Sequence, residues 1–244
     1  MTGGHSVNAG GPHAETGYNR RMASIPEAIE IETGAQPDAA VIWLHGLGAD
    51  GHDFEPIVPE LRLPAALRVR FVFPHAPQRP VTINMGMRMR AWYDILQLGG
   101  GAEDEAGIRD SQRQVDALVE RELGRGVAAR RVVLAGFSQG GAIALQAGLR
   151  YPEQLAGIMA LSTYLPLAAT LAAERHAANQ PVPVLMAHGT HDDIIPIARA
   201  QRSRDALAAL GYAVEWREYP MPHSVCAAEI GDIRNWLETV LAPD

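Results

Sequence analysis

The sequence is poor in the features that define several large classes of protein. It has a single cysteine, Cys226, so an internal disulfide is excluded, as is usual for a protein of the reducing cytoplasm. No apolar run approaches the roughly 18 residues of a membrane-spanning helix, so we expect no stable membrane insertion. The formal net charge of −7 argues against nucleic acid and anionic membranes as main partners.

Signatures of metal and nucleotide binding are also missing. No His, Cys and Asp residues stand at the spacing of a zinc site, and no glycine-rich phosphate loop or dinucleotide fingerprint occurs. We therefore expect neither a metal nor a cofactor.

The first residues differ in composition from the rest of the chain. Residues 1–21 contain Gly, Asn and His and lack the apolar core of a signal peptide, so they are predicted to be a disordered extension. Met22 is a candidate for the natural start of translation. The remaining residues, 22–244, have no internal repeat and no linker, and we expect them to form one domain.

Apolar, strand-like runs alternate with helical patterns along this domain. Such alternation is typical of an α/β fold with a mostly parallel central sheet and helices on both faces. The expected strands are Ala28–Thr33 at an edge, Ala40–Leu44, Val69–Phe73, Val132–Ala135, Leu155–Leu161, Val182–Ala187 and Ala213–Glu218. The expected helices are Asp53–Leu61, Asp104–Leu123, Gly140–Arg150, Leu167–His176, Pro196–Leu210 and Val225–Leu241.

The segment around Ser138 is the strongest motif in the chain. It reads as a buried strand, then Gly-x-Ser-x-Gly with Gly136 and Gly140, then an apolar helix. This is the pattern of a nucleophile elbow, in which a serine lies on a sharp turn and the two glycines avoid a clash. Ser138 is the predicted nucleophile.

The base and the acid of a catalytic triad follow from chain order. In α/β-hydrolases the acid and then the histidine come after the serine. His223 is the last histidine in the chain and follows a predicted strand, and Asp192 and Asp193 follow the preceding one. His223 would take the proton of Ser138, and one aspartate would orient its imidazole. The residues themselves leave open which aspartate does so.

The loop His45-Gly-Leu-Gly48 ends another buried strand. Its glycines allow close backbone approach, so the N–H groups of Leu47 and Gln139 are the predicted oxyanion hole. His45 is interpreted as structural, holding this loop by hydrogen bonds.

Residues 78–104 form a long connection without an evident regular pattern. Long loops of this kind are often functional. One hypothesis is that Met85 or Met87, flexible and polarizable, lines an acyl groove beside Ser138, with Trp92 as a further candidate. The alternative is that these side chains pack the loop onto the body of the protein.

Taken together, the elbow, the Leu44–Gly48 loop, the Arg90–Asp94 segment and the two strand-end loops resemble the phospholipase/carboxylesterase family. This family includes acyl-protein thioesterases and small bacterial carboxylesterases. The resemblance covers about Ala28 to Leu241 and implies an α/β-hydrolase fold without a large cap domain. It places the acid on Asp192, and the nucleophile and base on Ser138 and His223. It also implies catalysis without a metal or cofactor.

We therefore predict a cytoplasmic serine hydrolase that cleaves short- to medium-chain carboxylic esters through an acyl-enzyme. Thioesters are further candidate substrates, because oxygen and sulfur leaving groups share the same acyl chemistry. One alternative is an acyl-protein thioesterase or lysophospholipase, with an acylated protein as partner. Another is a non-catalytic binding protein on the same fold. A homodimer remains open, since no pattern in the sequence supports or excludes it.

Overall fold

The computed structural model describes Met1, residues 25–97 and residues 101–242. Apart from Met1, the extension expected over residues 1–21 lies outside the described residues. No helix in the described part of the chain has the length and apolar character needed to cross a membrane.

A seven-stranded sheet in the order β1-β3-β2-β6-β7-β8-β9 forms the centre of the molecule. All neighbouring strands run parallel except β1, which pairs antiparallel with β3. The mostly parallel sheet is therefore confirmed, and β1 and β9 are its two edge strands. The strands are β1 (Ala28–Glu32), β2 (Ala39–Leu44), β3 (Val69–Pro74), β6 (Val132–Phe137), β7 (Gly157–Leu161), β8 (Val184–Gly189) and β9 (Val214–Tyr219).

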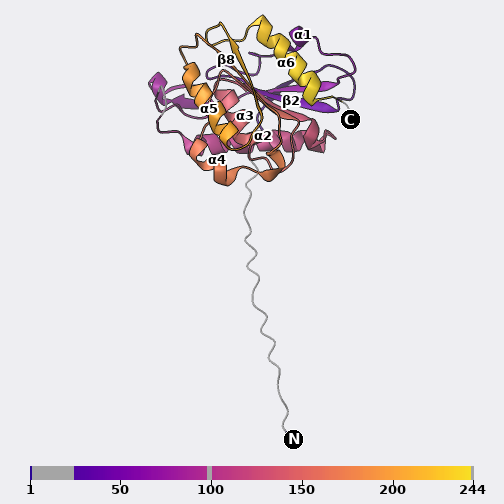
Figure 1. Ribbon diagram of the computed structural model, residues 1–244, viewed down its shortest axis with the longest axis horizontal. Coiled ribbons are helices and arrows are strands. Elements are labelled where there is room, and N and C mark those ends of the chain that lie inside the picture. Colours follow the sequence, from indigo (N-terminus) through magenta and orange to yellow (C-terminus); the bar gives the residue numbers. More distant parts are fainter. Residues whose placement is uncertain (2–24, 98–100, 243–244) are drawn as a thin grey trace.

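The inner strands are apolar on both faces because helices cover both sides of the sheet. One core cluster joins α2, α3, α4 and α5 to one face, and a second joins α1 and α6 to the other (Figure 1). The helices are α1 (Ile57–Leu61), α2 (Glu105–Gly124), α3 (Gln139–Gly148), α4 (Ala168–Glu174), α5 (Ile197–Ala209) and α6 (Ala227–Val240).

The connection over residues 78–104 contains regular structure that the sequence did not reveal. Strands β4 (Gln78–Val81) and β5 (Met87–Arg90) form an antiparallel hairpin, with a short 3-10 helix at Thr82–Asn84 between them. The pattern is hard to recognise because both strands are short and β4 contains Pro80, a residue depleted in strands. Between the strands, Met85 and Gly86 have positive φ values of 54° and 73°.

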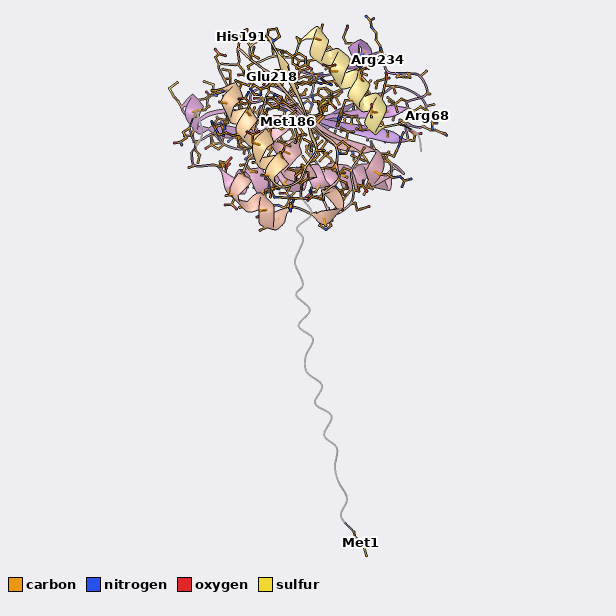
Figure 2. The ribbon with its side chains drawn as sticks, in the orientation of Figure 1. Met1, Arg68, Met186, His191, Glu218 and Arg234 are labelled. Carbon is orange, nitrogen blue, oxygen red and sulfur yellow. The ribbon has the colours of Figure 1, made fainter. Side chains whose placement is uncertain are left out.

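The loops at the carboxyl ends of the parallel strands meet at one edge of the sheet. In Figure 2, His191 of the loop after β8 and Glu218 near the end of β9 lie at the same side of the molecule, whereas Met186 of β8 lies inside it. Backbone hydrogen bonds join the two loops, from Thr190 N to Tyr219 O at 2.8 Å and from His191 N to Met221 O at 3.1 Å. Strand order thus brings together segments that are distant in sequence.

Candidate active site

Ser138 lies at the sharp turn between β6 and α3. Its backbone has φ 54° and ψ −121°, a conformation that residues with a side chain rarely adopt. The turn is held by hydrogen bonds from Ser138 N to Leu161 O at 2.8 Å and from Thr163 Oγ1 to Ser138 O at 2.6 Å. A Cβ on Gly136 would overlap the backbone of Gly140, and one on Gly140 would overlap Leu44 O. The glycines of the motif are therefore required by close backbone packing.

The structure brings His223 and Asp192 together. His223 Nδ1 lies 2.6 Å from Asp192 Oδ2, and the tautomer that donates this hydrogen bond from Nδ1 has Nε2 as its basic nitrogen. The other carboxylate oxygen, Oδ1, accepts hydrogen bonds from Ile194 N at 2.9 Å and Ile195 N at 2.8 Å. Both oxygens of the buried carboxylate thus have partners, which fixes its orientation towards His223.

The neighbouring aspartate occupies a different environment. Asp193 is exposed, whereas the side chain of Asp192 is fully buried. His188 also supports Asp192, since its Nε2 donates to Ile195 O at 2.8 Å and lies 3.3 Å from Asp192 Oδ2. Burial lowers the pKa of His188, so its ring is a neutral support for the acid loop.

The imidazole of His223 lies beside the elbow. Its ring centroid is 4.7 Å from that of Phe137, the residue that precedes Ser138. No hydrogen bond joins the Ser138 hydroxyl to His223 within the described residues. Catalytic hydrogen bonds are often long without substrate and shorten when it binds. The structure therefore places the candidate base beside the turn that carries the candidate nucleophile.

The loop after β2 packs against Ser138. A Cβ on Gly46 would lie 3.5 Å from the Cβ of Ser138, so the backbone that leads to Leu47 is adjacent to the reacting hydroxyl. His45 is buried, with Nδ1 2.7 Å from Gly46 O and Nε2 accepting from Ala76 N at 3.0 Å. Burial lowers the pKa of His45 to about 4. This neutral histidine holds the loop by hydrogen bonds, the structural role expected from the sequence.

The side chain of Gln139 connects the elbow to the segment that follows β5. Its Oε1 accepts from Trp92 N at 2.8 Å, and its Nε2 donates to Tyr93 O at 2.7 Å. Trp92 is fully buried, and its Nε1 donates to His45 O at 2.9 Å. Trp92 therefore links the loop of Leu47 to the elbow and does not line the cavity beside Ser138.

That cavity has a volume of about 120 Å³. Ser138, Leu47 and Gln139 are among its lining residues, so it borders the candidate nucleophile and both predicted oxyanion donors. Its apolar wall is made by Ile83, Ile95, Leu96, Ile194 and Ile195. Its other lining residues include Tyr93, Asp94, Glu103, Tyr164 and Arg199.

Met85 and Met87, the predicted lining of an acyl groove, are not among the lining residues of this cavity. They are 94% and 60% exposed, because both belong to the tip of the β4–β5 hairpin. Two isoleucines of the cavity wall, Ile194 and Ile195, belong to the loop that follows β8. The sequence indicated this loop only as the position of Asp192. Tyr164 and Arg199 had no sequence signal of function, since the contact between β7–α4 and α5 that joins them is long-range.

The described residues contain no group of three or more His, Cys, Asp or Glu side chains arranged to hold a metal ion. The single cysteine, Cys226, lies at the start of α6 with intermediate exposure.

Comparison with known proteins gives consistent matches. The family model for phospholipase/carboxylesterase matches residues 26–241. Acyl-protein thioesterase 1 of Gibberella zeae is 42% identical over 225 residues, which cover 88% of this chain and 96% of the relative. Acyl-protein thioesterase 1 of Yarrowia lipolytica is 40% identical, covering 86% and 96%. The crystal structure of Zea mays acyl-protein thioesterase 2 superposes with a TM-score of 0.79 at 28% identity, covering 89% of this chain and 100% of that one.

Proposed function

Because the chain belongs to the phospholipase/carboxylesterase family and is a hydrolase of the esterase and thioesterase kind, we propose that it cleaves acyl thioesters through an acyl-enzyme on Ser138. The proposed substrate class includes S-acylated cysteine in proteins. The similarity to acyl-protein thioesterases favours this activity over the carboxylesterase expected from the sequence. Carboxylic esters are then secondary substrates of the same site.

The observation that carries the proposal is the 2.6 Å hydrogen bond between Asp192 and His223, beside the elbow of Ser138. His223 Nε2 takes the proton of Ser138 as its Oγ attacks the acyl carbonyl carbon. The negative charge that develops on the carbonyl oxygen is stabilised by the N–H groups of Leu47 and Gln139. Asp192 stabilises the imidazolium that forms.

The attack of Ser138 gives a tetrahedral intermediate, which then breaks down as in other acyl-transfer reactions. The C–S bond breaks, and His223 returns its proton to the departing thiolate, which leaves the acyl group on Ser138. A water molecule loses a proton to His223 and attacks the same carbonyl carbon. The C–O bond to Ser138 breaks, the serine regains its proton, and a carboxylic acid is released.

Labelling with a fluorophosphonate tests whether the triad is assembled. We expect a stoichiometric adduct on Ser138, located by peptide mass mapping and lost in His223→Ala. Circular dichroism of both proteins provides the control for folding. An unlabelled but folded wild type would refute the proposal and favour a binding protein.

The leaving group is tested with a pair of acyl peptides that differ in one atom, an S-acyl cysteine peptide and its O-acyl serine counterpart. We expect the thioester to give the higher kcat/KM. A higher kcat/KM for the oxygen ester would indicate that the protein is mainly a carboxylesterase, and the proposed triad would still stand.

A further inference from the structure

The cavity beside Ser138 has a mixed lining. Part of its wall is aliphatic, whereas Tyr93, Tyr164, Arg199 and Glu103 bring polar groups into the same lining. Tyr164, Arg199 and Glu103 also border a neighbouring surface hollow, which Ser138 does not line. A plain alkyl chain could not form hydrogen bonds with these polar groups, so the lining indicates a ligand with both an apolar part and a polar group.

The polar groups are held firmly in place. The hydroxyls of Tyr93 and Tyr164 form a hydrogen bond of 2.7 Å, and both side chains are buried. The guanidinium carbon of Arg199 lies 3.3 Å from the centroid of the Tyr164 ring, in a cation–π contact. No carboxylate lies within ion-pair distance of Arg199 among the described residues, so its charge is not neutralised by a direct partner.

The cavity lies on the acyl side of the reaction. His223 must protonate the leaving group, so the leaving group has to lie next to His223. His223 does not line the cavity, whereas Ser138, Leu47 and Gln139 do. The part of the substrate that enters the cavity is accordingly the acyl chain.

The charges favour a neutral polar group over an anion. Arg199 and a tyrosine hydroxyl are donors, whereas Glu103 is an acceptor that already binds Leu167 N at 3.1 Å. Asp94, which binds the Thr82 hydroxyl and backbone, adds a second negative charge to the lining. A hydroxyl can both accept from Arg199 and donate to an acceptor, whereas a carboxylate only accepts and would face two like charges.

From this geometry we propose that Arg199, supported by Tyr164, is a specificity-determining residue that selects short acyl chains carrying a hydroxyl group. This proposal rests on the thioesterase function given above. An apolar cavity of about 150 Å³ in another protein holds benzene, which has six carbon atoms, so this smaller cavity of about 120 Å³ suits at most about six atoms beyond the carbonyl carbon. Arg199 and Tyr164 also border an open hollow on the surface. Solvent access on that side limits the expected preference to about tenfold, less than for a sealed polar site.

The test compares thioesters of one thiol, N-acetylcysteamine. The 6-hydroxyhexanoyl thioester is paired with the heptanoyl thioester, in which a methyl group replaces the hydroxyl. We expect wild-type kcat/KM to be about tenfold higher for the hydroxylated substrate. Arg199→Met should lower that ratio to one or below, Tyr164→Phe should lower it several-fold, and Arg199→Lys should retain part of it.

Arg202→Met provides the matched control, since Arg202 borders only the outer hollow, and it should keep the wild-type ratio. Thermal unfolding of each variant checks that the fold is intact. A wild-type ratio of one or less with normal heptanoyl turnover would overturn this inference and leave the proposed function standing. Faster turnover of the adipoyl thioester, which carries a carboxylate, would overturn the assignment to a hydroxyl. Failure to hydrolyse any of the thioesters, together with an unlabelled Ser138, would refute the proposed function itself.

Discussion

The loops of the candidate active site and the β4–β5 hairpin are in contact, through the hydrogen bond from Gly48 N to Arg90 O, but are held in different ways. Around Ser138 and Asp192, backbone atoms are in direct contact, and several positions have no room for a larger residue. In the hairpin, the side chains of Met85 and Met87 face solvent. Around the candidate site, close backbone contacts determine the conformation and restrict which residues fit. At the hairpin tip, many different side chains can be accommodated because they face solvent. Substitutions in the two regions should therefore differ greatly in effect.

The largest effect is expected from Asp192→Asn. The asparagine would favour the wrong tautomer of His223 and would not stabilise the imidazolium, so kcat should fall about 10⁴-fold. Asp193→Asn is the matched control, because Asp193 is exposed and should change kcat by less than about twofold. Steady-state kinetics on one thioester checks both variants, and equal losses in the two would contradict the assignment of the acid.

Gly136→Ala should strongly destabilise the elbow. The new Cβ would overlap the backbone of Gly140, so the free energy of unfolding should fall by about 3 kcal/mol or more. Gly231→Ala, in α6, adds the same methyl group where no atom lies within 4 Å. It should raise the free energy of unfolding by about 0.5–1 kcal/mol. Urea unfolding measures both, and a mild Gly136→Ala would show that the elbow can relax.

The buried side chain of Glu229, in α6, predicts that the stability of the protein depends on pH. It is fully buried, and burial, with a smaller effect of Asp232, raises its pKa from 4.5 to about 8. Between these values the folded protein holds a proton that the unfolded chain has released. The free energy of unfolding should therefore fall as the pH rises from about 4.5 to 8 and then level off.

Glu229→Gln should remove this dependence, because glutamine stays neutral. Each unit of the pKa shift corresponds to about 1.4 kcal/mol, so the variant should gain several degrees in Tm relative to wild type between pH 5 and pH 9. If Tm changed with pH in the same way in both proteins, Glu229 would not be the group whose ionisation causes the change.

The smallest effect is expected from Met87→Glu in the hairpin. Its side chain is 60% exposed and outside the cavity, so stability should change by less than about 0.5 kcal/mol. Turnover of the heptanoyl thioester should also stay close to that of wild type. A large increase in KM would mean that the substrate extends over the hairpin, and the comparison between the two regions would have to be revised.

The same difference explains what could be predicted from the sequence. Gly136, Ser138 and Gly140 form a local pattern, and their strained turn needs those residue types, so the motif is visible in the chain itself. Chain order and position at strand ends then indicated His223 and two adjacent aspartates. The sequence pattern could not separate Asp192 from Asp193, because the difference depends on burial and on two backbone N–H groups.

The polar lining of the cavity could not be predicted from the sequence for a related reason. Tyr93 and Tyr164 are distant in the chain and are joined by a hydrogen bond between their hydroxyls, and Arg199 of α5 packs on the Tyr164 ring. None of these contacts imposes a spacing on the sequence. The methionines, in contrast, suggested a binding surface by their chemistry, although the hairpin carries Met85 and Met87 away from the cavity.

The two edge strands of the sheet have a consequence for the protein at high concentration. An exposed strand edge can pair with the edge of another molecule and start aggregation. Here β9 carries Glu215, Arg217 and Glu218, and β1 at the opposite edge carries Glu30 and Glu32. A strand added at either side would have to desolvate these charges. The charged borders should therefore help the protein to remain dispersed in a crowded solution.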